Sequence, residues 1–356
     1  HLEECSELKR VDLSAGFLSL TSLIIRGCES VKEVKLGLQA LPNLSELVVS
    51  DCSEACVLSG VEGLKLLDHL NVDCYSMLQQ SRPKCLSSLT RLRDLTLSQK
   101  ATAWKQQRVW DYKSAGLEEL RSLVRLTISS AGRSTAAPIN LAELTNLGTL
   151  IMQGMVSFEG LDNLKRLERL HELGSSDDSL ECASDEDDET VQKCPPCLAE
   201  ARLLSIFPQN LTELRMICLK HLRRLDGIDR LIHLFCLHLE ACPMLELELP
   251  SLHALQEMEL LWIRECVTLK GVRGCDEMRK LEWVQFQGCD SMEELPFKDI
   301  HALPCRLTCL SFEGCRFARD RELLLEWADL CGPLCVAALR QFLWEYYSQE
   351  VRRRDG

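Results

Sequence analysis

A short pattern of apolar positions, repeated along the chain, constrains this sequence more than any other feature. The pattern places apolar residues at offsets 0, 3, 5 and 8, and it recurs 23 residues further on, as in Met258-x-x-Leu261-x-Ile263-x-x-Cys266 and Leu281-x-x-Val284-x-Phe286-x-x-Cys289. Because side chains alternate along a strand, the residues at offsets 3 and 5 fall on one face of a short strand. One such strand cannot bury its apolar face alone, so we expect the copies to stack into a parallel sheet over a shared core.

The same pattern fits again along most of the chain. Copies begin at Leu20, Leu44, Leu67, Leu92, Leu123, Leu147, Leu211, Leu234 and Leu307. A further unit begins with Leu161, Leu164, Leu167 and Leu170, and the pattern then fails. A partial unit, Leu8-x-x-Val11-x-Leu13, begins only 12 residues before the first full copy. After the Cys, apolar residues continue at every third position, as at Val31 and Val34, which suits a short 3₁₀ or helical return. Self-similarity at a period of about 20–29 residues with this spacing is the signature of the leucine-rich repeat.

The sequence therefore predicts an α/β leucine-rich repeat solenoid, with a curved parallel sheet on the concave side and short helical or 3₁₀ returns on the convex side. We expect four segments: repeats over 1–171, an acidic flexible loop over 172–199, further repeats over 200–317, and a helical cap over 318–356. Nine acidic residues and almost no apolar ones lie between Glu172 and Glu189, a composition that cannot repay the entropy of ordering. After Cys315 the apolar residues follow helical spacing, and an amphipathic cap would cover the exposed end of the core.

The 20 cysteines follow the repeat rather than a disulfide framework. Six of them fall at offset 8 and would lie side by side as buried thiols that behave as small hydrophobes, namely Cys28, Cys52, Cys242, Cys266, Cys289 and Cys315. This usage predicts a reducing, intracellular compartment, the cytoplasm or alternatively the nucleus. Two glycosylation sequons, Asn43-Leu44-Ser45 and Asn210-Leu211-Thr212, oppose that prediction. Both lie at a strand entry where the central Leu must be buried, so we interpret them as by-products of the repeat.

Composition excludes several functional classes. Lys and Arg number 41 against 54 Asp and Glu, and a net charge of −13 argues against binding to a nucleic-acid backbone. No apolar run is long enough for a membrane span. The chain starts at His1 without an initiator Met or a signal-peptide pattern, so we expect a fragment of a longer protein with a missing upstream domain.

Two stretches between repeats carry side chains that could bind a ligand or take part in a reaction. Gln99–Gly116 interleaves cations with aromatic residues, which can bind nucleic acid or an acidic partner, although we favour a surface loop folded back on the solenoid.

Cys194-Pro-Pro-Cys197 can be redox-active or form half a zinc site, and His171 and Cys182 could supply the remaining ligands. We favour neither use, because the second ligand pair lacks regular spacing. With no nucleophile motif or phosphate loop, we expect no enzyme, no cofactor and no metal; a hydrolase or redox enzyme built around the two cysteines is the remaining catalytic hypothesis.

Several units resemble the leucine-rich repeats of plant intracellular disease-resistance proteins of the nucleotide-binding (NLR) class, among them LTSLIIRGCESVKEV, LLWIRECVTLKGV and LEWVQFQGCDSMEELP. Those repeats carry Cys where extracellular plant receptors carry Asn followed by a Gly-x-Ile-Pro stretch, which is absent here. The resemblance covers about residues 20–317. It implies a domain that recognises pathogen effectors and holds its receptor inactive. The phosphate loop of that class, Gly-x-x-x-x-Gly-Lys-Ser/Thr, does not occur in this chain, so ATP binding is not carried over to these residues.

From these observations we predict a protein-recognition module, the effector-sensing and autoinhibitory repeat domain of a plant immune receptor. Its partner would be a pathogen effector or another domain of the same receptor. The alternative is the substrate-recognition arm of an F-box ubiquitin ligase, whose repeats also carry Cys. Repeats in that class usually run slightly longer than the 23–24 residues seen here.

The residue at offset 4 of each strand is expected to point away from the core, into the concave face. Along the chain this column reads Ile24, Val48, Asn71, Thr96, Thr127, Ile151, Arg215, His238, Trp262, Gln285 and Ser311. Its later half is larger and more polar or aromatic, and offset 6 adds a further arginine. We predict a protein-binding hot spot formed by Arg215, His238, Trp262, Arg264 and Gln285, because Trp and Arg dominate interface energetics. The alternative is that Trp262 and Trp283 are half-buried packing between neighbouring repeats.

Overall fold

The computed structural model describes residues 1–37, 39–53, 56–72, 84–98, 115–133, 139–155, 158–173, 207–219, 222–245, 252–293, 296–297 and 304–316. These residues fall into two compact units, one up to Leu167 and one from Glu168 onward. In both units the offset-3 and offset-5 residues of the repeat form short parallel strands.

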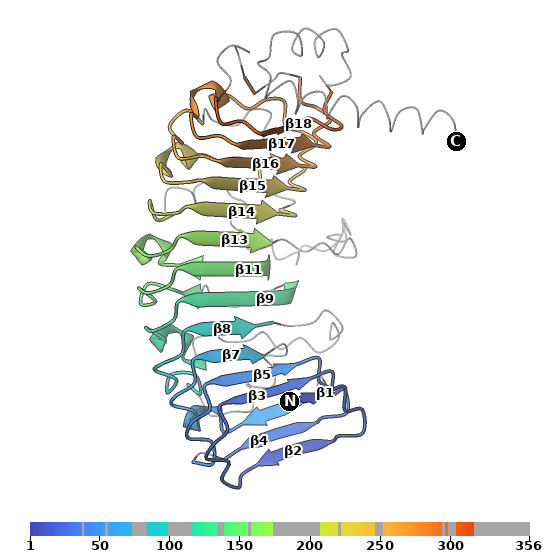
Figure 1. Ribbon diagram of the computed structural model, residues 1–356, viewed down its shortest axis with the longest axis vertical. Coiled ribbons are helices and arrows are strands. Elements are labelled where there is room, and N and C mark those ends of the chain that lie inside the picture. The colour runs from blue at the N-terminus through green and yellow to red at the C-terminus, as the bar shows by residue number, and fades with distance from the viewer. Residues whose placement is uncertain are drawn as a thin grey trace, which may run out of the picture. The chain divides into compact units, whose positions relative to one another are not determined.

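In the first unit the main strands lie side by side in chain order and are all parallel (Figure 1). They are β1 (Leu2–Glu3), β3 (Ser22–Arg26), β5 (Glu46–Ser50), β7 (His69–Val72), β8 (Asp94–Leu97), β9 (Arg125–Arg133) and β11 (Thr149–Met155). The offset-3 and offset-5 side chains point into the core, and Leu47, Val49, Leu70 and Val72 are fully buried.

The second unit has the same kind of arrangement, formed by β13 (Arg169–Leu173), β14 (Glu213–Ile217), β15 (Cys236–Glu240), β16 (Leu260–Arg264), β17 (Trp283–Gln287) and β18 (Cys309–Ser311). The strands pair in parallel and in register, so that Leu214, Leu237, Leu261, Val284 and Leu310 form one buried row. The predicted leucine-rich repeat solenoid, with the core on one face of a parallel sheet, is confirmed in this part of the chain.

Some of the return segments in the first unit differ from the prediction. Instead of a helical turn, β2 (Arg10–Leu13), β4 (Glu33–Leu36) and β6 (Val57–Ser59) form a second parallel sheet, and β10 (Ile139–Asn140) pairs with β12 (Phe158–Glu159). In β4 the residues Val34 and Leu36 are buried while Lys35 is exposed, and this alternation favours a strand over a 3₁₀ turn. The partial unit at Leu8 is explained in the same way, because its Val11 pairs with Val34 in the return sheet.

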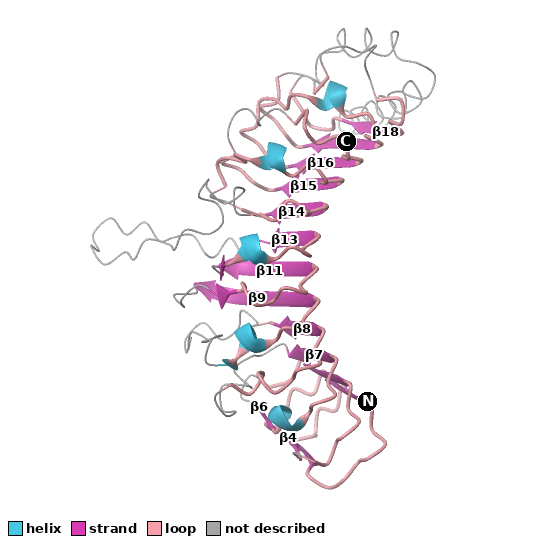
Figure 2. Cartoon of the chain, turned by 90° about the vertical axis from the view of Figure 1, so that its left-hand side faces the viewer, coloured by secondary structure: helices cyan, strands magenta, loops and turns pink. Residues whose placement is uncertain are grey.

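Further along, the predicted 3₁₀ returns are present (Figure 2). They are η1 (Val61–Gly63), η3 (Leu117–Glu119), η4 (Leu161–Asn163), η7 (Ile228–Arg230) and η8 (Cys275–Glu277). A glycine with φ between 82° and 90° precedes each of these turns, and the first residue of each turn is buried. That backbone conformation is open to glycine and strained for other residues.

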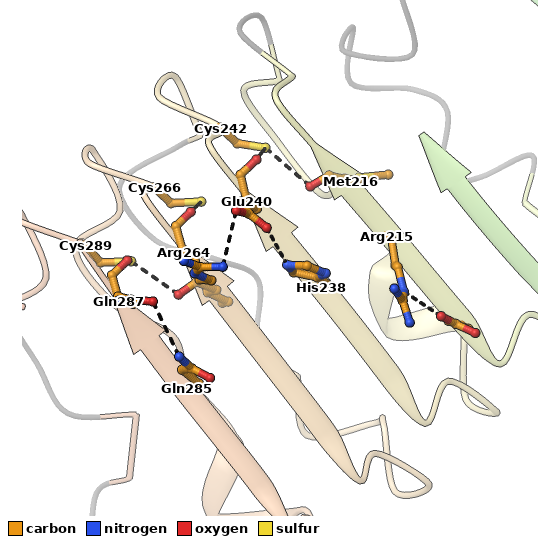
Figure 3. Close-up of polar contacts among 12 residues, drawn as sticks. Arg215, Met216, His238, Glu240, Cys242, Arg264, Cys266, Gln285, Gln287 and Cys289 are labelled. Atoms are coloured by element: carbon orange, nitrogen blue, oxygen red, sulfur yellow. Dashed lines mark hydrogen bonds and ion pairs between the residues drawn. The ribbon is translucent and has the colours of Figure 1, made fainter. Parts of the chain in front are cut away.

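A second left-handed position closes the strands at their other end. The residue before the offset-8 position, or the equivalent residue after β1, has positive φ in several repeats, at Glu4, Gly27, Asp51, Cys218, Ala241, Glu265, Gly288 and Gly314. The chain turns inward there and buries the following Cys; Cys28, Cys242, Cys266, Cys289 and Cys315 have no exposed surface, whereas Cys52 is half-buried. The 14 cysteines among the described residues form no disulfides with one another. The Sγ of Cys242 donates to the carbonyl of Glu240 at 3.4 Å and to that of Met216 at 3.8 Å (Figure 3).

Several predicted features lie outside the described residues: most of the acidic loop, the cation and aromatic stretch up to residue 114, Cys182, Cys194, Cys197 and the helical cap over 318–356. The predicted segment boundaries therefore stay predictions. Within the described ranges, no helix is long and apolar enough to cross a membrane. The same ranges hold no cluster of three or more His, Cys, Asp or Glu side chains arranged to bind a metal ion.

Candidate functional site

The candidate site lies on the outer face, which we define as the face of strands β13–β17 that points away from the core. Strand register places four of the predicted residues in one row across β14–β17, in the order Arg215, His238, Trp262 and Gln285. The fifth, Arg264, follows Trp262 by two residues on β16 and pairs in register with Glu240 on β15. The fold therefore brings all five predicted residues onto neighbouring strands. Figure 3 shows four of them, Arg215, His238, Arg264 and Gln285.

Trp262 is held on the outer face by two neighbours. The His238 ring stacks on its indole, with centroids 4.7 Å apart and an angle of 14° between the ring planes. The guanidinium carbon of Arg264 lies 5.8 Å from the centroid of the indole, within the range of a cation–π contact. The side chain keeps 36 % of its surface exposed, so it is a supported but accessible aromatic group.

Two further apolar side chains lie beside it. Leu260 is 36 % exposed and precedes Trp262 by two residues on β16, and Trp283, which is 42 % exposed, pairs in register with Leu260 on β17. We call Leu260, Trp262 and Trp283 the Trp patch. Exposed large apolar side chains that lie together on one surface are typical of interaction sites. Sequence reasoning missed Leu260, although its offset of 2 also points outward and would have revealed it.

Glu213 joins two basic side chains at one edge of the row. Its Oε1 lies 2.6 Å from the Nε of Arg215 and 3.1 Å from the Nε2 of His171. His171, considered from the sequence as a zinc ligand, thus contacts a carboxylate on the neighbouring strand β14. The arginine side chain is 44 % exposed and the carboxylate only 10 %, so the charge that solvent meets at this edge is the positive one.

Glu240 plays the corresponding role beside the Trp patch. Its Oε2 lies 3.0 Å from the Nε2 of His238, and its Oε1 lies 3.4 Å from the Nη1 of Arg264. The histidine contact has the length of a hydrogen bond but not the alignment, since Nε2 of this ring has no hydrogen-bond partner. The Nε of Arg264 is also buried without a partner.

Those two atoms and Glu62 Oε2 make up the buried side-chain nitrogen and oxygen atoms that lack partners among the described residues. Two of the three therefore lie next to Trp262. A buried polar atom without an aligned hydrogen bond is disfavoured, although His238 Nε2 keeps its 3.0 Å contact with the Glu240 carboxylate. The concentration of such atoms at one point of an otherwise regular sheet is expected where function, rather than stability, selects the side chains.

Side-chain amides extend the polar part of the face toward β18. Trp283 donates from Nε1 to Gln285 Oε1 at 3.4 Å, and Gln285 donates from Nε2 to Gln287 Oε1 at 3.5 Å. Gln287 in turn donates from Nε2 to Glu313 Oε2 at 3.1 Å. This series of hydrogen bonds orients the side chain of Gln285 and fixes that of Trp283 at one edge of the Trp patch.

Burial also sets the protonation of the two histidines. It lowers the pKa of His238 below the ordinary value of 6.5, and Glu240 opposes this shift while Arg215 and Arg264 add to it. Burial lowers the pKa of His171 as well, against the opposing charge of Glu213. In the first unit the pKa shift of His69 has the opposite direction, because a hydrogen bond to Asp94 raises the pKa of this histidine.

These shifts predict a pH-dependent stability with a defined sign. A histidine whose pKa is lowered on folding binds more protons in the unfolded state, so its contribution is complete above pH 6.5 and is lost as the pH falls from there toward the folded pKa. We expect His238→Gln to flatten the loss of stability between pH 7.5 and 5.5, measured by chemical denaturation. His69→Gln is the matched control with the opposite sign: it should steepen that loss, because a raised pKa stabilises at low pH. Equal pH slopes in wild type and His238→Gln would contradict the assignment.

Comparison with known proteins gives likenesses in structure alone. No family model matches the sequence, and the search of curated proteins finds no match. Among solved structures, an internalin (inlF) from Listeria monocytogenes is 13% identical with a TM-score of 0.45, over 83% of this chain and 82% of that chain. The functional domain of InlJ from Listeria monocytogenes is 14% identical with a TM-score of 0.43, over 83% of this chain and 59% of that chain. A leucine-rich repeat protein of Leptospira interrogans is 18% identical with a TM-score of 0.38, over 92% of this chain and 95% of that chain. Identities and scores this low carry no argument about function.

Proposed function

We propose that this chain is a protein-binding leucine-rich repeat module and that the outer face of β14–β17 is its binding surface. The observation that carries the proposal is the Trp patch, three exposed large apolar side chains on one face of a sheet whose other face is fully buried. Arg264 lies beside the patch and Arg215 lies two strands away, and tryptophan and arginine are both enriched in binding hot spots. A core role does not explain these side chains, because they project from the face opposite the core.

More specifically, we propose the effector-sensing and autoinhibitory repeat domain of a plant immune receptor of the nucleotide-binding class. The Cys that follows the strand in six of the repeats, as in Gly27-Cys28 and Gly288-Cys289, supports this origin through the sequence resemblance. The partner would then be a pathogen effector or another domain of the same receptor, met in the cytoplasm. Sequencing the complete transcript tests this origin: a phosphate loop upstream supports the receptor, whereas an F-box segment would favour a ubiquitin ligase.

Site-specific photo-crosslinking tests the binding surface in the full chain. A photoreactive phenylalanine derivative at Trp283 keeps an aromatic group at the edge of the Trp patch. The same group at Ile232, an exposed apolar position in the turn between η7 and β15, is the matched control. We expect a discrete protein adduct from position 283 that is absent from position 232 and is lost in a Trp262→Ala background. Adducts that are the same from both positions, or that persist without Trp262, would refute this surface.

A further inference from the structure

The outer face has acceptors that are already engaged. Its carboxylates each contact two basic side chains, with Glu213 beside His171 and Arg215 and Glu240 beside His238 and Arg264. The amide oxygens of the glutamines on β17 also receive donors, from Trp283 and from Gln285 itself. A partner would therefore find few unoccupied acceptors among these side chains.

Donors, by contrast, are in surplus. A guanidinium carries five N–H groups in a planar fork and accepts nothing. Among the described residues, Arg215 meets a carboxylate through its Nε alone. Arg264 has a single 3.4 Å contact through Nη1, and its Nε has no partner. If Arg264 turns toward a new acceptor, it gives up this long ion pair and its cation–π contact with Trp262.

The solvent-accessible charge on this part of the outer face is positive, whereas the net charge of the whole chain is negative. The chain carries −13 overall, but here Arg215 is 44 % exposed while its partner Glu213 is only 10 % exposed, and Arg264 at 29 % is slightly more exposed than its partner Glu240 at 24 %. A local cationic surface in an acidic protein attracts and orients an anionic group. The apolar surface of Leu260, Trp262 and Trp283 lies beside Arg264, so an anionic group bound there is expected to have an apolar neighbour.

We propose that this face recognises an acidic peptide segment of the protein partner, in which an Asp or Glu side chain engages Arg264 and an adjacent apolar side chain packs on the Trp patch. A carboxylate matches the fork of the guanidinium with two parallel hydrogen bonds. It also carries one negative charge, and the nearby Glu213 and Glu240 repel it less than they repel a doubly charged phosphate. Arg215 provides a second donor group two strands away. This inference rests on the proposed function and adds the chemistry of the partner.

Selection of a random dodecapeptide library displayed on phage against the immobilised full chain provides the test. The expected enrichment is for peptides that place Asp or Glu beside Leu, Phe or another large apolar residue. In a synthetic copy of an enriched peptide, changing the acid to its amide should raise Kd about tenfold or more, since charge-assisted hydrogen bonds are lost. Arg264→Gln in the chain should have the same effect. Arg125→Gln is the matched control, because this arginine also projects from a strand and pairs with Asp94, but lies in the first unit.

The outcomes separate the two levels of the proposal. Enriched neutral peptides that need Trp262 but tolerate Arg264→Gln would overturn the carboxylate while leaving the protein-binding face intact. A failure to enrich any peptide whose binding is lost in Trp262→Ala would overturn the proposed binding face and the inference with it. Equal losses from Arg264→Gln and Arg125→Gln would show a non-specific charge effect and would also overturn the inference.

Discussion

Gly60→Ala is expected to lower the free energy of unfolding by about 3 kcal/mol, a large loss for one methyl group. Gly60 precedes η1 with φ +85°, where a residue other than glycine is strained by about 1–2 kcal/mol. A Cβ there would lie 1.9 Å from the carbonyl oxygen of Leu36 and 2.8 Å from its carbon. Those atoms belong to the backbone of β4, so relief requires β6 and the turn to move away from the return sheet.

Gly148→Ala is the control for this effect. Gly148 does not have a left-handed backbone, and the nearest atom to an added Cβ lies at 3.7 Å, an ordinary contact. The change should stay within about 0.5 kcal/mol of wild type. Denaturation followed by circular dichroism measures the loss, and hydrogen exchange over Glu33–Leu36 and Val57–Ser59 locates it, which matters because repeat proteins can unfold in parts. Similar midpoints for the two variants would show that the return sheet yields to the extra methyl group.

Trp262→Ala should weaken binding of the crosslinked partner by about 2 kcal/mol or more, which is roughly 30-fold in Kd. The indole offers a large apolar surface with two supporting contacts, from His238 and from the guanidinium of Arg264, that fix its orientation before binding. Stability should fall by only about 1 kcal/mol, the order of one aromatic pair. Titration calorimetry with the purified partner, beside a thermal melt of each variant, gives both quantities.

Leu261→Ala supplies the contrast from the adjacent residue of the same strand. Leu261 points the other way and is fully buried, so its truncation should cost about 3 kcal/mol of stability through the cavity that it leaves. If Trp262→Ala unfolds the protein as Leu261→Ala does, the indole belongs to the structural core. If Trp262→Ala is folded and binds the partner with wild-type affinity, the hot spot lies elsewhere.

Most of the main sheet follows from the sequence because strand alternation is a local rule. The spacing of Leu261 and Ile263 identifies one buried pair, and the 23-residue shift to Val284 and Phe286 then fixes both the direction and the register of the next strand. Each repeat contacts only its neighbours, so an error in the predicted register of one strand does not affect the prediction for distant strands. The same rule placed Arg215, His238, Trp262 and Gln285 in one row without knowledge of any side-chain contact.

The return segments were harder to predict because two periods compete there. Val31 and Val34 fit a spacing of three, but Val34 and Leu36 fit a spacing of two, and the strand is formed. The regular repeat period of the main sheet does not decide between these two spacings. The glycines before the 3₁₀ turns were a usable signal that went unnoticed, since Gly60, Gly116 and Gly160 each precede a buried aliphatic residue.

At the candidate site the sequence indicates which residues meet, but not how they pair. The contact of Glu213 with both Arg215 and His171 joins residues 42 positions apart and depends on side-chain rotamers. The stacking of His238 on Trp262 also depends on burial that neighbouring strands create. Orphaned atoms such as Arg264 Nε are a property of the whole packing arrangement, so no local pattern predicts them.

The left-handed corners at the strand ends have a consequence for how such a chain can diversify. Where Gly288 and Gly314 occupy this corner, the turn is unstrained, but Ala241 and Glu265 occupy it at the ends of β15 and β16 with φ 51° and 52°. The left-handed backbone at each of these two residues destabilises the fold by about 1 kcal/mol, and a change to glycine would remove that strain. A lineage that loses stability while altering its outer-face residues can therefore recover it at these corners, without changing any side chain that a partner touches.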